Sequence, residues 1–468
     1  MAEAEHAPDE TRERQVRDED GAIDSGFVEQ VSQAVLLSDV TTLRKLVAEL
    51  HEADLGDLIE ALDAEERPKL ISLLGNDFDF AALTEVDDAV REEILEELSP
   101  ETVAEGVRDL DTDDAVYILE DLDEADKREI LDKLTPAERT VLQQGLDYPE
   151  DSAGRRMQPE VIAVPPFWTV GQTIDFLRET KELPERFFEI FVADPSHRFV
   201  GTVRLDQLLR TQRPVSVADL VEDDRRVVQA TDDIEDVARM FQRYNLVAAP
   251  VIDAAGRLVG VMTIDDIVDV IEEAGDDDVK QLGGVDAEEE ISDSVRQVAL
   301  GRFRWRFISL IAAFVSASVM AMFEEQLGKL VALAVLAPIV ASQGGNAATQ
   351  TMTVAVRALG TGELGGWNMG RFFRREMIVG VLNGVAFALI TALVAGFWFG
   401  NPMLGSVIGL AMVATLIIAA LAGVAVPLAL DKAGIDPAIA SGTFVTTITD
   451  VVGFFSFLSI ATLLLRLT

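Results

Sequence analysis

The sequence predicts a multidomain membrane protein: an all-α superhelical domain, an α/β domain pair and a connecting helix precede a transmembrane domain of five α-helices. Apolar segments of bilayer-spanning length fall in residues 302–468. Leucines recur at spacings of three and four residues between 26 and 153, which is the helical period. Short β-like runs with glycine-bearing turns occur twice in the same order within 154–274. These observations divide the chain into a disordered acidic tail and four folded parts, at 1–25, 26–153, 154–274, 275–301 and 302–468.

Charge is distributed very unevenly along the 468 residues. Residues 302–468 hold ten Lys/Arg and seven Asp/Glu, which leaves 29 basic and 75 acidic residues in 1–301, a net charge of −46. A surface this acidic repels nucleic acid, because phosphate binding needs Lys and Arg. It attracts cations, and divalent cations most strongly. Solubility in a salt-rich cytoplasm is the competing explanation of the same acidity.

The composition also argues against several kinds of site. The chain has no cysteine, so we expect neither a disulfide framework nor a thiolate metal site. Its three histidines, His6, His51 and His197, lie far apart in the sequence, and no nucleophile–base set appears, so we do not expect an enzyme. The charged N-terminus lacks the apolar core of a signal peptide, which predicts that the first part of the chain stays in the cytoplasm.

Residues 26–153 read as a small superhelix of stacked helices. Short amphipathic segments are separated by helix-start signals, such as Ser99-Pro100-Glu101 and Thr135-Pro136-Ala137. Most acids of this part are expected to form solvated faces. A minority can bind a hard cation, but their spacing does not select which ones.

The α/β part contains two units that read FFEIFVADPSHRFVGTVRLDQLL and LVAAPVIDAAGRLVGVMTIDDIVDVI. This duplication resembles a pair of CBS domains, in which Gly followed by Thr and Asp marks an adenosine nucleotide site. Gly260, Thr263 and Asp266 match that pattern in the second unit, which makes ATP a candidate ligand there. The alternative is that Thr263 only caps the following helix. The first unit has Arg204 in place of the Thr and lacks the Asp, so we expect at most one nucleotide site.

Residues 275–301 connect this pair to the membrane part and are dense in acids. Ile291, Val295 and Val298 fall on one face of a predicted helix. Crowded carboxylates repel one another unless a cation lies between them. A solvated linker is the alternative.

Five apolar segments follow, and the loops between them orient the chain. The positive charges precede the first segment (Arg302, Arg304, Arg306), separate the second from the third, and separate the fourth from the fifth (Lys432), so these loops are expected in the cytoplasm of a cell with this protein in its cytoplasmic membrane. The N-terminus is then cytoplasmic and the C-terminus outside. The predicted segments are Trp305–Phe323, Leu330–Val356, Met377–Phe399, Met403–Leu430 and Ala438–Leu465.

Two features inside these segments carry chemistry. Pro338, Gly344 and Gly345 predict a helix interruption within the membrane, whose freed carbonyls would line a cavity together with the amide of Asn346. A tightly packed kink is the alternative, since small residues favour close helix contact.

The second feature is Asp450, a lone acid in the last apolar segment. An intramembrane carboxylate costs roughly 2.5–3.5 kcal/mol and usually faces a polar path or a partner. Carboxylate, amide and carbonyl oxygens are the ligands of magnesium, which keeps several of its waters. Two symmetry-related acids would hold such an ion better than one, so we expect a homodimer. The alternative is a structural Asp450, hydrogen-bonded to Thr446, Thr447 or Thr449.

The motifs GGNAATQ, DPAIASGTFVTTITDVVGFF and YPEDSAGRRM, together with the CBS-like pair, resemble the MgtE family of magnesium channels and transporters. The resemblance implies a homodimer with five membrane helices per subunit and a cytoplasmic magnesium sensor. It assigns Asp450 and Asn346 to the pore, and Asp265, Asp266, Asp277 and Asp278 to regulatory magnesium. Ala274, Arg243 and Asn245 stand where family members commonly carry acids, which puts the number and strength of the sensor sites in question.

We therefore expect a Mg²⁺-selective channel or transporter, gated by magnesium that screens its cytoplasmic acids. Two alternatives stay open: a coupled divalent-cation exchanger, and a nucleotide-sensing CBS membrane protein. Manganese, cobalt and nickel tolerate similar oxygen ligands, so the sequence does not settle the transported ion.

Overall fold

The computed structural model describes residues 16–19, 21–48, 50–120, 122–181, 183–184, 186–221, 226–287 and 289–465. The chain forms two compact units, Met1–Glu273 and Ala274–Thr468. Most of the predicted acidic tail lies outside the described residues.

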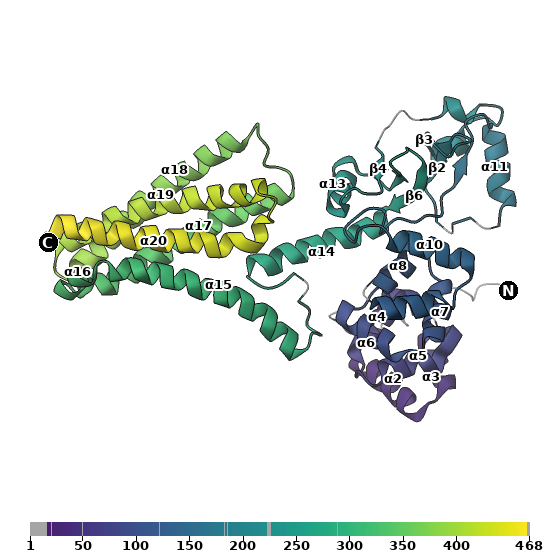
Figure 1. Cartoon of the computed structure of the whole chain (residues 1–468), viewed down its shortest axis with the longest axis horizontal. Coiled ribbons are helices and arrows are strands. Elements are labelled where there is room, and N and C mark those ends of the chain that lie inside the picture. Colours follow the sequence, from purple (N-terminus) through teal and green to yellow (C-terminus); the bar gives the residue numbers. More distant parts are fainter. Residues whose placement is uncertain are drawn as a thin grey trace, which may run out of the picture. The chain divides into compact units, whose positions relative to one another are not determined.

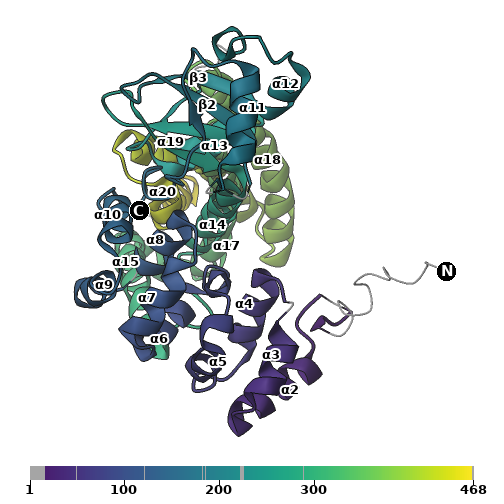
Figure 2. The ribbon, with the colours of Figure 1, turned by 90° about the vertical axis from the view of Figure 1, so that its right-hand side faces the viewer.

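The first unit begins with short helices, as the leucine spacing predicts. They share one apolar core, and Figure 2 shows them stacked one after another. The predicted helix starts are confirmed: Ser99 accepts a hydrogen bond from the Thr102 amide, and Thr135 forms a capping box with Glu138. The helices are α2 (Ser25–Leu37), α3 (Val40–Val47), α4 (Glu52–Ala61), α5 (Arg67–Leu74), α6 (Asp88–Glu97), α7 (Pro100–Arg108), α8 (Thr112–Glu120), α9 (Glu124–Leu131) and α10 (Pro136–Leu146), with 3₁₀ turns at Gly75–Asp77 and Phe80–Leu83.

Two three-stranded sheets follow, and their identical topology confirms the predicted duplication. In each sheet a parallel pair is followed by an antiparallel pair. Arg204 lies opposite Glu189 in the first sheet, as Thr263 lies opposite Ala248 in the second. The elements are β1 (Ala163–Val164), α11 (Val170–Glu179), β2 (Glu189–Ala193), β3 (Phe199–Arg204), α12 (Leu205–Arg210), a 3₁₀ turn (Val217–Asp219), β4 (Val228–Gln229), α13 (Ile234–Tyr244), β5 (Ala248–Ile252), β6 (Leu258–Thr263) and α14 (Ile264–Leu282).

The connecting segment differs from its prediction. It is not one helix over 275–301: α14 continues to Leu282, a loop follows, and α15 (Val295–Ala321) starts only after its cap, Ser294. Ile291 lies in that loop with its side chain fully exposed, so it shares no helix face with Val295 and Val298. The Ser294 side chain accepts a hydrogen bond from the Gln297 amide, and this cap fixes the helix start that the apolar spacing alone misplaces.

The second unit is a bundle of long helices (Figure 1). Four helical stretches of the described chain are both long and apolar enough to cross a membrane: Val295–Ala321, Met369–Trp398, Pro402–Lys432 and Gly442–Leu465. The fifth predicted span corresponds to α17, which is 29 residues long but carries a run of amide and hydroxyl side chains. Its role as a span remains a proposal. The helices after α15 are α16 (Glu324–Lys329), α17 (Ala332–Gly360), α18 (Met369–Trp398), α19 (Pro402–Lys432) and α20 (Pro437–Leu465).

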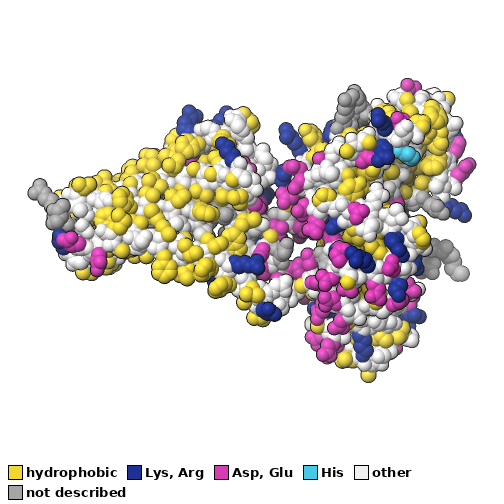
Figure 3. All heavy atoms as spheres, in the orientation of Figure 1, with side chains coloured by type: hydrophobic (Ala, Val, Ile, Leu, Met, Phe, Trp, Pro, Cys, Tyr) yellow, Lys and Arg dark blue, Asp and Glu magenta, His cyan; other side chains and the backbone are white. Residues whose placement is uncertain are grey.

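Helix α19 forms the centre of this bundle and packs against α17, α18 and α20, whereas α15 packs on α20. Glycines bring the helices close: a Cβ at Gly405 would lie 2.4 Å from the Ala392 carbonyl oxygen of α18. Apolar side chains cover the surface of the bundle in Figure 3, and many are exposed, including Leu393 and Phe397 of α18. This is the surface expected of helices that face lipid.

The predicted helix interruption at Gly344 and Gly345 is wrong. Helix α17 runs continuously from Ala332 to Gly360 with Pro338 inside it. Gly344 instead makes a close contact, since a Cβ there would lie 2.5 Å from Thr415 Cγ2 of α19. The alternative of close helix packing is therefore the one that the structure shows, because the neighbouring helices need the space of a missing side chain.

Candidate functional site

Asp450 lies half-buried in the apolar body of α20. The three threonines that were candidates to satisfy it are engaged elsewhere. The hydroxyls of Thr446, Thr447 and Thr449 donate to the carbonyl oxygens of Gly442, Thr443 and Thr446, at 2.8, 2.6 and 2.9 Å. Within the described residues, no side chain donates a hydrogen bond to Asp450, so its carboxylate keeps its capacity to accept from a ligand or a hydrated ion.

Glu376 of α18 provides a contrast within the same unit. It is buried, and Arg375 donates to its Oε1 from Nε at 2.9 Å, while the Thr351 hydroxyl of α17 donates to Oε2 at 3.3 Å. Glu376 is therefore neutralised by a neighbouring side chain, as buried membrane acids usually are. Asp450 has no such counter-charge in the described residues.

Asn346 lies on an exposed polar stripe of α17. The exposed polar residues of this stripe recur at helical spacing. The opposite face is buried and contains Gly344, Ala348, Thr351 and Met352. Thr353 donates to the Thr349 carbonyl oxygen at 2.9 Å within the helix, and the exposed amides of Asn346 and Gln350 are polar groups of the kind that need a partner or water at membrane depth. The stripe consists of Ser342, Asn346, Thr349, Gln350 and Thr353.

Asp277 and Asp278 lie at the end of α14, beside the membrane helices. Leu282 of the same helix packs on the cluster that includes Ala348 and Met352 of α17. Burial raises the pKa of Asp278, the Asp436 carboxylate raises it further, and Arg357 opposes this. Burial also raises the pKa of Asp277. These acids are partly desolvated and close to a third, an arrangement that favours a bound cation or proton.

Asp265 and Asp266 lie at the start of the same helix, within the first unit. The Thr263 hydroxyl donates to Asp266 Oδ2 at 2.7 Å. Burial nevertheless raises the pKa of Asp266 to about 7, and the Asp265 and Asp114 carboxylates contribute. Asp265 itself is exposed.

Two acids of α8 interact electrostatically with Asp266, and no sequence motif distinguishes them from other acids of the domain. Burial raises the pKa of Asp114 to about 6, and Asp111 and Glu52 add to it. Burial raises the pKa of Asp113 well above its usual range, with Asp266 the largest charge contribution. Asp113 Oδ1 is buried and has no hydrogen-bond partner in the described residues. The only sequence signal was the adjacent pair in TDDAV, which is one of many such pairs in this acidic domain.

The predicted nucleotide residues occupy two different settings. A Cβ at Gly260 would lie 2.6 Å from Met157 Sδ and 2.7 Å from the Gln158 carbonyl oxygen, so this glycine serves close packing of the 157–158 backbone. The Thr263 hydroxyl donates a hydrogen bond to Asp266, whose charge in turn acts on Asp113 of α8. In the first sheet the equivalent Arg204 forms an exposed ion pair with Asp206 at 3.0 Å.

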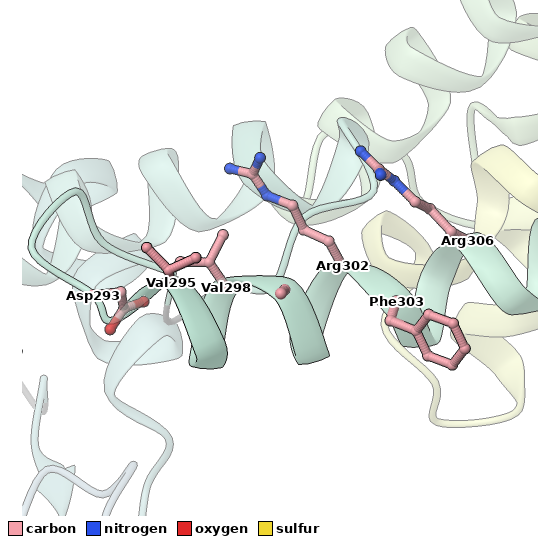
Figure 4. Close-up of a pocket in the computed structure, with 7 residues that line it drawn as sticks. Asp293, Val295, Val298, Arg302, Phe303 and Arg306 are labelled. Carbon is pink, nitrogen blue, oxygen red and sulfur yellow. The ribbon is translucent and has the colours of Figure 1, made fainter.

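Two pockets in the described part of the chain contain none of the predicted site residues. Figure 4 shows the pocket of about 410 Å³ at the start of α15, where Arg302 and Arg306 extend from one side of the helix. Arg302 pairs with Glu289. Because two guanidinium groups and one carboxylate, Asp293, line this pocket, it does not suit a cation. The other pocket, of about 610 Å³, lies among α9, α10 and the residues that follow them.

Among the described residues, no group of three or more His, Asp or Glu side chains already has the geometry of a metal site. Burial and like charge raise the pKa values of Asp113 in α8 and Asp266 in α14, but these acids do not form a complete set of metal ligands. Hydrated magnesium needs few direct protein ligands, because it retains several waters.

Three family models match the chain. The MgtE model, described as a divalent cation transporter, matches residues 337–460; the MgtE intracellular N domain matches 50–151; and a CBS domain matches 217–273. Among solved structures, the soluble part of a magnesium transporter is 25% identical, with a TM-score of 0.47 over 53% of this chain and 98% of that one. The cytosolic domain of the Mg²⁺ channel MgtE in complex with ATP is 30% identical, with a TM-score of 0.44 over 52% and 99%.

Full-length relatives extend these matches. The magnesium transporter MgtE of Thermus thermophilus is 33% identical over 93% of this chain and 98% of its own length. The magnesium transporter MgtE of Enterococcus faecalis is 35% identical over 90% of this chain and 94% of its own length. At this identity over nearly the whole of each protein, the chain belongs to the MgtE family of divalent cation transporters.

Proposed function

We propose that the chain is a Mg²⁺-selective channel or transporter of the cytoplasmic membrane, gated by magnesium that binds its acidic cytoplasmic regions. The observation that carries this proposal is Asp450: a carboxylate within an apolar helix, with no hydrogen-bond donor among the described side chains. The relatives named as magnesium transporters support magnesium as the transported ion.

The pore residues are proposed to be Asp450 and Asn346. An Asp carboxylate and an Asn amide oxygen bind the water shell of magnesium, which avoids the cost of stripping the ion bare. The polar stripe of α17 is exposed in a single chain, and covering it requires a second copy or an aqueous path. We therefore propose a homodimer, with the N-terminus in the cytoplasm, the C-terminus outside and α17 as the fifth span.

Gating is proposed to be electrostatic. At low internal magnesium the buried acids Asp113, Asp114 and Asp266 repel one another, and so do Asp277 and Asp278 near Asp436. Magnesium would screen both groups, favouring the packed, closed state. Limited proteolysis of the full chain with and without millimolar magnesium tests this, and equal cutting rates would contradict it.

The experiment for transport is Asp450→Asn, measured as magnesium uptake in cells that lack their own importers. We expect near-complete loss, because the amide has no charge to attract the dication. Asp450→Glu keeps the charge, and Glu325→Gln removes an exposed acid of α16 in the same unit; the latter should transport normally. Normal uptake by Asp450→Asn would refute the proposal.

Two further measurements address the alternatives. Magnesium flux without a coupled counter-flux of sodium or protons separates a channel from an exchanger. Titration of the full-length protein with ATP and with magnesium separates a nucleotide sensor from a magnesium sensor. ATP binding at Thr263 and Asp266 must overcome the acids of α8, so we expect magnesium to bind in the absence of ATP.

A further inference from the structure

Three helices meet at one small-residue contact in the membrane unit. Helices α17, α19 and α20 lie side by side in Figure 1 and pack against one another. We call the residues where they meet the three-helix contact: Gly344 of α17, Thr415 of α19, and Thr449 and Gly453 of α20. Thr415 and Thr449 are almost completely buried, with exposed fractions of 1% and 0%.

The contact leaves no space for a side chain at position 344. A Cβ there would lie 2.5 Å from Thr415 Cγ2, far inside van der Waals distance, and 3.6 Å from Thr449 Cβ. The methyl of Thr415 belongs to a short β-branched side chain that has few rotamers in a helix. By contrast, a Cβ at the adjacent Gly345 would meet nothing within 4 Å. Two neighbouring glycines of one helix are therefore not equivalent.

Thr415 carries a second unusual feature. Its hydroxyl is buried, and no hydrogen-bond partner for it occurs in the described part of the chain. An unpaired buried hydroxyl costs free energy, so a residue chosen for packing alone would be apolar. The same side chain lies against α20 as well, since a Cβ at Gly453 would lie 3.5 Å from Thr415 Cγ2.

We propose that Gly344 and Thr415 are positioning residues for ion passage, an inference that rests on the proposed function. Asn346 follows Gly344 by two residues in α17, and Asp450 follows Thr449 directly in α20. The three-helix contact therefore sets the spacing between the backbone segments that carry the two pore residues. A side chain at position 344 pushes α17 away from α19 and α20 and so displaces Asn346 relative to Asp450.

The test compares Gly344→Ala with Gly345→Ala. Both substitutions add the same methyl group to the same helix, so their effects on helix propensity are matched. We expect Gly344→Ala to raise the half-saturating magnesium concentration by about tenfold, because ligand positions tolerate only about half an ångström of error. We expect Gly345→Ala to resemble the wild type. The amount of protein in the membrane is measured for each variant.

The rescue experiment uses Thr415→Ser, which removes the obstructing methyl group and keeps the hydroxyl. The double variant Gly344→Ala/Thr415→Ser should regain most of the wild-type affinity for magnesium. If Gly344→Ala alone fails to reach the membrane, the double variant should restore its insertion. A double variant as impaired as Gly344→Ala overturns the proposal, as does Gly344→Ala with wild-type affinity.

Asp450→Asn in the same assay separates this inference from the proposed function. An inactive Asp450→Asn beside an unaffected Gly344→Ala overturns only the positioning role. An Asp450→Asn variant that transports normally overturns the transport assignment itself.

Discussion

The two ends of helix α8 in the first unit contrast in how their carboxylates are neutralised. At its C-terminal end, Glu120 pairs with Arg155 at 3.1 Å and with Arg156 at 3.3 Å. Arg91 and Arg156 also lie over the Tyr117 ring, with each guanidinium carbon within 4.3 Å of the ring centre. At its N-terminal end, burial and like charge raise the pKa values of Asp113, Asp114 and Asp266, and no cationic side chain is among the main influences on them.

The two ends differ in charge compensation: side chains of the protein neutralise the carboxylate at one end, and no described cationic side chain does so at the other. The arginines of the YPEDSAGRRM segment neutralise Glu120, so that end needs no ion. The acidic end contains desolvated like charges, whose repulsion a proton or a bound cation would reduce. One helix thus carries a neutralised carboxylate at one end and desolvated like charges at the other, about two turns apart along its axis.

The largest effect should come from removing the neutralised carboxylate. Glu120→Gln leaves Arg155, only 5% exposed, without its carboxylate and should destabilise the first unit by about 3 kcal/mol. Because this contact needs no ion, the loss should be the same with and without magnesium. Native-state proteolysis of the full chain measures it, with the exposed Glu97→Gln as control. A loss seen only without magnesium would contradict the distinction between the two ends.

Removing a charge from the acidic end of α8 should stabilise the unit, whereas removing one from the other end should destabilise it. Asp113→Asn removes a buried charge whose Oδ1 has no partner, and should stabilise the unit by about 1–2 kcal/mol in magnesium-free buffer. The added protection from magnesium should shrink accordingly. Asp109→Asn, which changes an exposed acid just before α8, is the control. Unchanged protection by magnesium in Asp113→Asn would show that the ion acts elsewhere.

Lowering the pH should stabilise the unit, as we expect magnesium to do. The pKa of Asp266 is raised to about 7 and that of Asp114 to about 6, so the folded state holds protons that the unfolded state has lost. This contribution to stability is complete below the ordinary pKa near 4 and disappears as pH rises through 6 and 7. Between about pH 8 and pH 6 the unit should gain about 2 kcal/mol in magnesium-free buffer. The double variant Asp114→Asn/Asp266→Asn should lose this dependence; if it keeps it, other groups are responsible.

The smallest effect should come from Thr263→Val. The Thr263 hydroxyl donates to Asp266 at 2.7 Å and lowers its pKa, so losing this hydrogen bond should raise that pKa further. The pH at which the unit loses the stability contributed by protonated Asp266 should therefore rise, by an amount equivalent to about 1 kcal/mol of free energy. Thr263→Ser keeps the hydroxyl and should behave like the wild type. A downward movement would show that the hydroxyl does not stabilise the charged carboxylate.

Local patterns were sufficient to predict much of this protein. The spacing of the leucines predicts the short helices, and the helix-start residues at Ser99 and Thr135 are confirmed as caps. The repeated strand pattern aligns Arg204 with Thr263, and the registers of the two sheets agree. Asp450 stands out in the sequence because an acid within an apolar segment is costly wherever that helix packs.

Other features depended on contacts between distant segments. The glycines at 344 and 345 predict a broken helix when only α17 is considered, but Gly344 lies against Thr415 of α19, which leaves no space for a Cβ. Ile291 has the spacing of the helix face that begins at Val295, yet the cap at Ser294 excludes it.

The sequence by itself determined the order of the domains, the period of each helix and strand, and the presence of one acid in the apolar body of the last membrane helix, because these depend on residues near one another in the chain. Only the tertiary structure decided which of the 75 acids in 1–301 are buried together. Desolvation depends on what covers a carboxylate, and Asp113, Asp114 and Asp266 are brought together from positions about 150 residues apart in the sequence.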